Sequence, residues 1–276
     1  MYHLNKMEKF NSAKHFGIWR EAALPFSYFS LPLYLDFSAY LLSHNGKDVI
    51  VAQDIYYPHE FPALFLHPNS KNWENFSVTF ATDQDIKKVR NKKIEIILRK
   101  ETGTEYFYNT VSLVNPTGKI NQRIKQFKKL YGSSYKLRRT YNRKKIEKFY
   151  YFWKKQKGRN GDTFKESEKL FFFCLDNLRK YKIKQIYIEI GGKLAGLAFG
   201  VSHSSGGWVG LQLKVNYKYK GLSRFLHHER ARLFSREKLF TLGTGSHDAG
   251  ISQFKEELGP AFSKEYFYIL TGKRKF

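Results

Sequence analysis

Residues 185–216 read QIYIEIGGKLAGLAFGVSHSSGGWVGLQLKVN, and this stretch decides the fold of the second half of the chain. It holds three runs of strand composition, 185–190, 193–203 and 207–216. The turns GGK and SSGG between them are too short for a crossover, because parallel neighbours need a connection of about a dozen residues. The stretch therefore predicts three consecutive antiparallel strands joined by tight turns.

Amphipathic helices and single strands flank these three strands. Upstream, the periodicity predicts a short strand over 135–141 and helices over 142–157 and 167–181. Downstream it predicts a helix over 222–236, a strand over 238–243, a helix over 249–258 and a strand over 264–272. The order is strand, two helices, three antiparallel strands, helix, strand, helix, strand, which is a mixed α+β arrangement.

The first hundred residues carry a weaker pattern. A helix is predicted over Lys6 to Ala23, followed by strand-like runs at 47–57, 61–67 and 93–100 with Pro, Asn and Gly between them. A boundary is predicted at NPTGK, residues 115–119. We therefore expect two units, residues 1–118 and residues 119–276.

Positive charge is concentrated in one part of the chain. Lys and Arg number 49 against 24 Asp and Glu, for a formal net charge of +25, and fifteen of the cations fall between Lys119 and Lys157 with one acid, Glu147. A local excess of this kind favours a polyanionic partner, either tRNA or the anionic surface of a membrane, over a uniformly lysine-rich surface. The residues predicted to contact phosphates are Arg123, Arg138, Arg139, Arg143, Lys144 and Lys145.

Several classes of protein are not favoured by the sequence. No apolar run reaches the roughly 20 residues that a bilayer span requires, and the first ten residues lack the apolar core of a secretory signal. Cys174 is the single cysteine and falls in an apolar helix stripe, so it is expected in the core. His227 and His228 point about 100° apart on a helix and do not form a metal site together. We expect a cytoplasmic protein, peripheral membrane contact being open, with no metal and no tightly bound cofactor.

The element order resembles the GNAT acyltransferase fold, with VNYKYKGLSRFLHHERARLF (215–234) at the donor-binding turn and helix of that fold. More narrowly, the chain resembles the family of the phosphatidylglycerol lysyltransferase C-terminal domain over residues 100–276. Four segments carry this resemblance: TEYFYNTVSLVNPTGK, NQRIKQFKKLYG, YKGLSRF and LGTGSHDAGISQFKEELGP. Within them the matching residues include Glu105, Tyr108, Gly118, Lys119, Arg123, Phe127, Asp248, Gly250, Lys255 and Pro260.

The resemblance implies two tandem GNAT-like domains, each a mostly antiparallel mixed sheet flanked by helices, and an enzyme that takes aminoacyl groups from tRNA. Two departures leave the substrate open. Ile124 follows Arg123 where the family usually has Asn, and the loop at 243–248 has fewer acids than is common there. That loop is similar to the one in Fem-type peptidyltransferases, which also use aminoacyl-tRNA.

The turn YKYKGLS is a candidate donor-binding site. Lys218, Gly221 and Ser223 fit a degenerate form of the GNAT turn that binds the pyrophosphate of acyl-CoA at a helix N-terminus, and Lys220 and Arg224 add positive charge. An ordinary strand-to-helix turn with one glycine explains the same residues. An incomplete pyrophosphate-binding pattern is also expected if the donor is aminoacyl-tRNA instead of acyl-CoA.

The loop after the strand at 238–243 is a candidate for chemistry. Gly243 and Gly245 allow a sharp turn whose N–H groups, beside Ser246, would support an oxyanion, and His247 would accept a proton from the attacking group. Glu189 stands where many GNAT enzymes keep a general base. The alternatives are a surface His247, a capping Asp248, and a Glu189 that faces solvent on the same side of its strand as Tyr187.

Three functions therefore stay open at this stage. The first is transfer of an aminoacyl group from aminoacyl-tRNA to an amine or hydroxyl acceptor such as a phospholipid headgroup. The second is acyl-CoA-dependent N-acylation on the same fold. The third is a non-catalytic module that binds RNA or a membrane.

Overall fold

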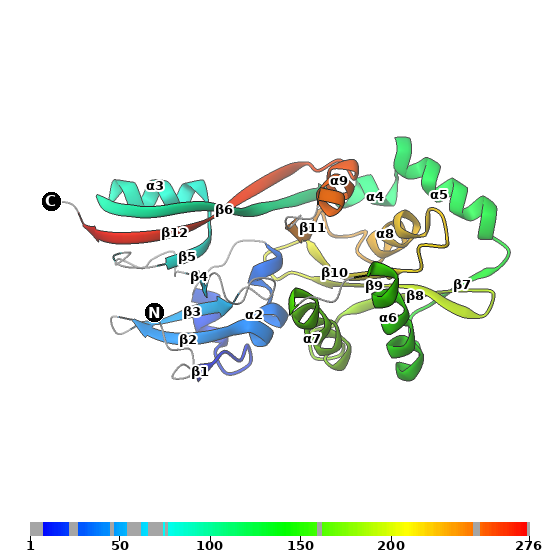
Figure 1. The fold of residues 1–276 in the computed structure, drawn as a ribbon, viewed down its shortest axis with the longest axis horizontal. Helices are drawn as coiled ribbons and strands as arrows, with labels where there is room; N and C mark the ends of the chain where they lie inside the picture. The colour runs from blue at the N-terminus through cyan, green and yellow to red at the C-terminus, as the bar shows by residue number, and fades with distance from the viewer. Residues whose placement is uncertain are drawn as a thin grey trace.

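The computed structural model describes residues 8–21, 27–44, 47–53, 62–65, 74, 77–158, 162–244 and 249–274, and their strands form two sheets (Figure 1). The smaller sheet has the order β1-β2-β3-β4, with bounds Glu8–Lys9, Ala39–His44, Lys47–Gln53 and Pro62–Phe65. The larger has the order β5-β12-β6-β11-β10-β9-β8-β7. Its bounds in that order are Ser77–Ala81, Phe262–Arg274, Ile94–Asn109, Leu239–Thr244, Trp208–Val215, Lys193–Ser202, Lys184–Ile190 and Tyr135–Arg138.

The predicted meander is confirmed. Strands β8, β9 and β10 are consecutive and antiparallel, and the elements predicted for residues 135–272 occur in the predicted order. Strands β10 and β11 are parallel, and they register through two pairs, Trp208↔Phe240 and Val209↔Thr241. Beyond Val209 the two strands diverge, and β10 shifts register against β9 between Gly210 and Leu213. The divergence makes the centre of this sheet irregular, and bulges of this kind are common beside active sites.

Two long strands connect the two halves of the chain. Strand β6 pairs with β12 from Ile94 to Phe107 and with β11 through Glu105 to Asn109. The larger sheet therefore takes strands from both sides of residue 118. The α+β class is confirmed, while a division into two units at that residue stays a prediction.

Helices cover both faces of the larger sheet (Figure 1). On one face lie α4 (Thr110–Val114), α5 (Gly118–Tyr131) and α8 (Leu222–Leu233). There Phe127 of α5 and Phe225 of α8 stack with their ring centres 4.6 Å apart. On the other lie α6 (Arg143–Lys157) and α7 (Asp162–Asp176), where Tyr150 stacks on Phe171 at 4.4 Å. Helix α9 (Ala249–Glu257) follows β11. The buried stripe predicted for α6 is confirmed.

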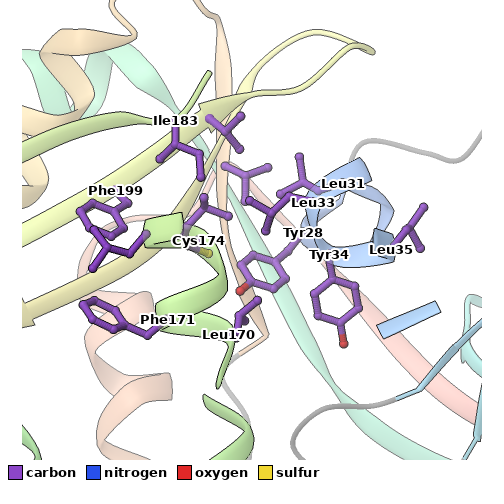
Figure 2. Close-up of a cluster of buried hydrophobic side chains, with 14 of the residues drawn as sticks. Tyr28, Leu31, Leu33, Tyr34, Leu35, Leu170, Phe171, Cys174, Ile183 and Phe199 are labelled. Carbon is purple, nitrogen blue, oxygen red and sulfur yellow. The ribbon is translucent and has the colours of Figure 1, made fainter. Parts of the chain in front are cut away.

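The N-terminal elements join the core on the α7 side. They are α1 (Phe16–Glu21), the 3-10 turn η2 (Tyr28–Ser30) and α2 (Pro32–Ser38), while α3 (Asp83–Asn91) lies against β5 and β6. Figure 2 shows Tyr28 and Leu31 beside Leu170 and Cys174 of α7 in one hydrophobic cluster. Cys174 is a buried free thiol, and burial raises its pKa to about 12, so its predicted place in the core is confirmed.

The predicted N-terminal helix is too long. Glu8 and Lys9 pair with Leu41 and Tyr40 of β2 instead of continuing a helix, so a long-range strand contact overrides the local pattern. Among the described residues, no helix has the length and apolar character to cross a bilayer. Within the same ranges, no group of three or more metal-ligating side chains comes together.

Candidate active site

The predicted catalytic loop is bounded by described structure on both sides. Ser246, His247, Gly245 and Asp248 lie outside the described residues, so their roles stay predictions. The upstream flank is held closely. Gly243 has a φ of 74°, and a Cβ at this position would lie 3.2 Å from Cγ of Tyr28. Both the backbone conformation and the packing of Tyr28 therefore require glycine at the start of the loop.

A buried lysine fixes the same flank. Lys255 on α9 donates from Nζ to the carbonyl oxygens of Leu242 at 2.9 Å, Gly243 at 2.7 Å and Thr244. These three acceptors match the three hydrogens of an ammonium group. Burial lowers the pKa of Lys255 to about 7, and the nearby charge of Glu105 opposes that shift. The start of the loop is thus tied to a cation that titrates near neutral pH.

Glu105 supplies the buried negative charge. Its side chain is fully buried on β6, at a position that the family resemblance identified. The two carboxylate oxygens accept hydrogen bonds from the backbone N–H of Tyr28 (2.9 Å) and from the hydroxyls of Thr241 (2.7 Å), Ser27 (2.7 Å) and Tyr266 (2.8 Å). These four hydrogen bonds tie β6 to residues 27–28, to β11 and to β12.

A buried arginine occupies the place where β10 and β11 diverge. Arg230 on α8 is 1% exposed; its Nη1 donates to the carbonyl oxygens of Phe199 (3.0 Å) and Gln212 (3.4 Å). Its Nε has no hydrogen-bond partner among the described residues. A Cβ at Gly210 would lie 2.7 Å from Nη2 of Arg230, so the missing side chain of residue 210 makes room for the guanidinium. Burial lowers the pKa of Arg230 to about 9, which still leaves it charged at neutral pH.

His227 is neutral and has a defined tautomer. Burial lowers its pKa well below the ordinary value, and the charges of Arg230, Arg224 and Lys255 lower it further. Its Nδ1 lies 2.9 Å from Nη2 of Arg230, which has only hydrogens to offer, so Nδ1 accepts and the ring proton is on Nε2. From the sequence, His227 was considered only as a metal ligand. The buried polar run at 227–230, in a helix that packs on the sheet, is the signal that would have identified this residue.

We call Glu105, His227, Arg230, Thr241 and Lys255 the β11 cluster. It places two cations and a neutral imidazole around the strand that leads into the predicted catalytic loop. Fixed donors and charges in a water-poor environment stabilise negative charge that develops on a carbonyl oxygen during acyl transfer. The cluster therefore concentrates buried charge and fixed hydrogen-bond donors beside the predicted catalytic loop.

The predicted donor turn is packed against α5. Gly221 has a φ of 80° and caps α8, and a Cβ there would lie 2.3 Å from the carbonyl oxygen of Arg123. Arg224 points toward α9, where it pairs with Glu257 at 2.5 Å and lies 4.2 Å above the ring of Phe254. The other predicted donor residues, Lys218, Lys220 and Ser223, lie at or near the surface of the turn. The structure brings Arg224 close to His227, but not the lysines of the turn.

Glu189 is distant from the β11 cluster, because β9 and β10 separate its strand from β11. The expectation that Glu189 faces solvent is wrong, because Tyr141 covers it. The rings of Tyr141 and Tyr187 stack with their centres 5.6 Å apart, and the Tyr141 hydroxyl donates to Oε1 of Glu189 at 3.0 Å. Arg138 donates to the same carboxylate at 3.2 Å. Burial alone would raise the pKa of Glu189, but the two hydrogen bonds and the positive charges of Arg138 and Lys145 together lower it.

The predicted polyanion surface lies at the end of the molecule formed by α5, β7 and α6. Two of the predicted residues form ion pairs, Arg143 with Glu147 and Asp176, and Arg138 with Glu189. Arg139, Lys144 and Lys145 are exposed, and none of them has an acidic partner within the part of the chain that the structure describes. Arg123 is exposed on α5 and Arg138 on β7. Most of the predicted residues thus remain available to a partner.

The fold is similar to solved structures at low sequence identity. A conserved protein of unknown function from Bacteroides thetaiotaomicron superposes with a TM-score of 0.75 at 13% identity, over 96% of this chain and 99% of that one. L-PGS from Bacillus licheniformis gives 0.60 at 11%, over 96% and 93%. The C-terminal domain of a protein named as a lysylphosphatidylglycerol synthetase, from Agrobacterium fabrum, gives 0.56 at 7%, over 86% of each chain. The predicted resemblance is confirmed at the level of fold.

Neither a protein-family model nor a curated protein sequence matches the chain. At the identities of the solved structures, the likeness concerns the fold, and the substrates do not follow from it.

Proposed function

We propose that this protein is an acyltransferase that moves an aminoacyl group from aminoacyl-tRNA to an amine or hydroxyl acceptor, such as a phospholipid headgroup. The observation that carries the proposal is the likeness in fold to L-PGS over 96% of the chain. The β11 cluster and the exposed cations of α5, β7 and α6 support it. Two tandem GNAT-like units, a cytoplasmic location and peripheral membrane contact belong to the same proposal.

The chemistry needs orientation, proton handling and charge stabilisation. The acceptor's oxygen or nitrogen attacks the ester carbonyl and loses a proton to a base, for which His247 remains the predicted residue. The carbonyl oxygen becomes negative near Arg230, whose Nε–H has no partner among the described residues, and the bond to the tRNA ribose then breaks as the ribose oxygen takes a proton. No electron is gained or lost, so the reaction requires no redox cofactor.

The exposed cations would hold the tRNA. Contacts from Arg123, Arg139, Lys144 and Lys145 to phosphates release counterions, which makes binding depend steeply on salt. These side chains carry charge without an acidic partner among the described residues, so binding RNA breaks no ion pair of the folded protein. Tight but salt-insensitive binding of aminoacyl-tRNA would contradict this part of the proposal.

One observation favours acyl-CoA as an alternative donor. Gly221 begins α8 in the left-handed conformation with no side-chain cap, beside the exposed Lys218 and Lys220, as a phosphate-binding turn would. Protection of the protein from thermal unfolding by CoA, and loss of that protection in a Lys218→Gln/Lys220→Gln variant, would support this donor.

A transfer assay tests the proposal. Purified protein is incubated with bulk tRNA charged with labelled amino acids and with a total lipid extract, and label is followed into the organic phase. We expect lipid-linked label, and at least a hundredfold less with an Arg230→Lys variant that still folds, because removing one oxyanion donor costs about 10²–10³ in rate. Intact tRNA esters with bound tRNA and no product would instead indicate the non-catalytic module.

A further inference from the structure

Helix α6 presents an exposed face, of which only Lys144 and Lys145 are among the proposed tRNA contacts. Its buried stripe is Ile146, Phe149, Tyr150 and Trp153. The opposite side carries two large exposed rings, Tyr151 at 52% and Phe152 at 47%. Around these rings lie four exposed lysines, which complete what we call the α6 face: Lys144, Lys145, Lys148, Tyr151, Phe152 and Lys155.

The α6 face carries no negative charge. Glu147, the only acidic residue of the helix, accepts a hydrogen bond from Arg143. Within the described residues, none of the four lysines has an acidic partner. The face therefore combines apolar rings with positive charge that forms no ion pair among the described residues, although the charge of Lys145 helps to lower the pKa of Glu189.

A third exposed ring lies near the C-terminal end of the helix. Tyr217 is 51% exposed and its backbone N–H donates to Oε1 of Gln156 at 3.3 Å. The ammonium of Lys157 lies 5.5 Å from the centre of the Tyr217 ring. Lys157 is four residues after Trp153, on the buried side of α6, so Tyr217 lies beside the end of the helix and is not part of the α6 face.

The rings are supported from inside. Tyr151 packs on Phe172 of α7 with ring centres 6.2 Å apart, and Phe152 packs on Phe149 at 6.3 Å. A residue that stacks on a nucleic-acid base needs an open ring face. A side chain whose inner half is packed and whose outer half meets water is suited to shallow insertion between lipid headgroups. Phe152 has no polar atom, so its exposed half gains most from leaving water.

We propose that the α6 face binds the surface of an anionic lipid bilayer. The helix lies in the plane of the interface, the rings enter the headgroup region, and the lysines contact lipid phosphates. The positive charge and absence of acids on this face complement that surface. The proposal rests on the proposed function only in that the acceptor would be a lipid, and the binding itself requires no transfer.

The position of α6 connects this surface to the candidate site. On the inner side of the helix, the ring of Trp153 lies 4.2 Å from Nζ of Lys214 on β10. Strand β10 is the strand that diverges from β11 beside Arg230. Helix α6 alone would therefore separate a bilayer on the α6 face from β10, the strand that borders the β11 cluster.

Vesicle sedimentation with the full chain tests the proposal, using phosphatidylcholine vesicles with and without phosphatidylglycerol and no donor. We expect binding only to the anionic vesicles. A Lys148→Gln/Lys155→Gln variant, which keeps the proposed tRNA contacts, should bind about 25-fold more weakly, because one lysine near an anionic surface contributes about fivefold. A Tyr151→Ser/Phe152→Ser variant should also bind at least tenfold more weakly at unchanged charge.

Two control variants separate this surface from general charge and general hydrophobicity. Lys87→Gln/Arg90→Gln on α3 removes two exposed cations elsewhere, and Val111→Ser/Leu130→Ser removes two exposed apolar side chains near α5. Both controls should bind vesicles as the wild type does, and all four variants should melt within a few degrees of it. Equal weakening by a control overturns the proposal.

A parallel titration with tRNA separates membrane from RNA. If the α6 variants lose tRNA binding and keep vesicle binding, the face is an RNA surface and the proposal is wrong. Vesicle binding that needs the α6 face, together with a failed transfer assay, would contradict the proposed function and leave this inference standing.

Discussion

Cations occur in this protein in two contrasting environments. Around β10, α8 and α9, the side chains of Lys214, Arg230 and Lys255 are buried and engaged by carbonyl oxygens, an amide oxygen or a ring. In residues 119–157 most of the fifteen cations are exposed. A buried charge is costly to desolvate and must be offset by its partners, whereas an exposed one changes folding little. The first group therefore belongs to the fold and site, and the second is available for a partner.

The largest effect is expected at the carboxylate that anchors the buried group. Glu105→Ala would remove the carboxylate acceptor of four buried donors, and each lost hydrogen bond of this kind costs roughly 1–3 kcal/mol. We expect a loss of about 4 kcal/mol or more in the free energy of unfolding, measured by urea denaturation, if a single unsatisfied donor costs about 1 kcal/mol. Thr241→Val, which removes one donor, is the control and should cost far less. A loss as small as that of the control would mean that Glu105 does not organise this region.

A smaller effect is expected where the two regions meet, at the start of α8. Gly221→Ala forces a side chain into a φ of 80° and against the carbonyl oxygen of Arg123, 2.3 Å away. Backbone strain alone costs roughly 1–3 kcal/mol, and the contact with α5 adds to it. Gly206→Ala is the matched control, since its φ is 91° and nothing lies within 4 Å of the added Cβ. If both variants lose the same free energy of unfolding, α5 moves away from the added Cβ at no cost. The exposed cations of α5 would then not be held rigidly against α8.

The buried lysines predict a pH dependence. The pKa of Lys255 is about 7 in the folded protein and has its ordinary, higher value in the unfolded chain. Between the two values the unfolded state binds more protons, so stability rises with pH from about 7 toward 10, by at most about 1.4 kcal/mol for each pH unit. Urea denaturation at pH 6, 7.5 and 9 measures this effect. Above pH 7, the free energy of unfolding of the wild type should rise relative to that of a Lys255→Met variant. A constant difference across this range would mean that Lys255 keeps its ordinary pKa.

Sequence periodicity predicted the second half well because its elements are amphipathic and local. The stripe Ile146, Phe149, Tyr150 and Trp153 identified α6 and its buried side. Sequence periodicity did not predict that β6 and β12 would pair along their length, since such pairing depends on contacts between residues far apart in the sequence. The buried state of Arg230 was missed for the same reason. A polar side chain within a helix indicates a solvent-facing position unless a distant glycine, here Gly210, makes room for it.

The smallest effect on folding is expected in the exposed group, where the effect on binding should be large. Replacing Arg139, Lys144 and Lys145 together by Gln should change the free energy of unfolding by less than about 0.5 kcal/mol per site, because these side chains have no acidic partner among the described residues. The same variant should bind tRNA more weakly, and its slope of log affinity against log salt should fall by about one for each phosphate that it no longer neutralises. A Lys87→Gln/Arg90→Gln/Arg236→Gln variant removes the same charge elsewhere and should keep the wild-type slope. Equal slopes in the two variants would show that tRNA responds to net charge alone, and the distinction between structural and available cations would then not extend to function.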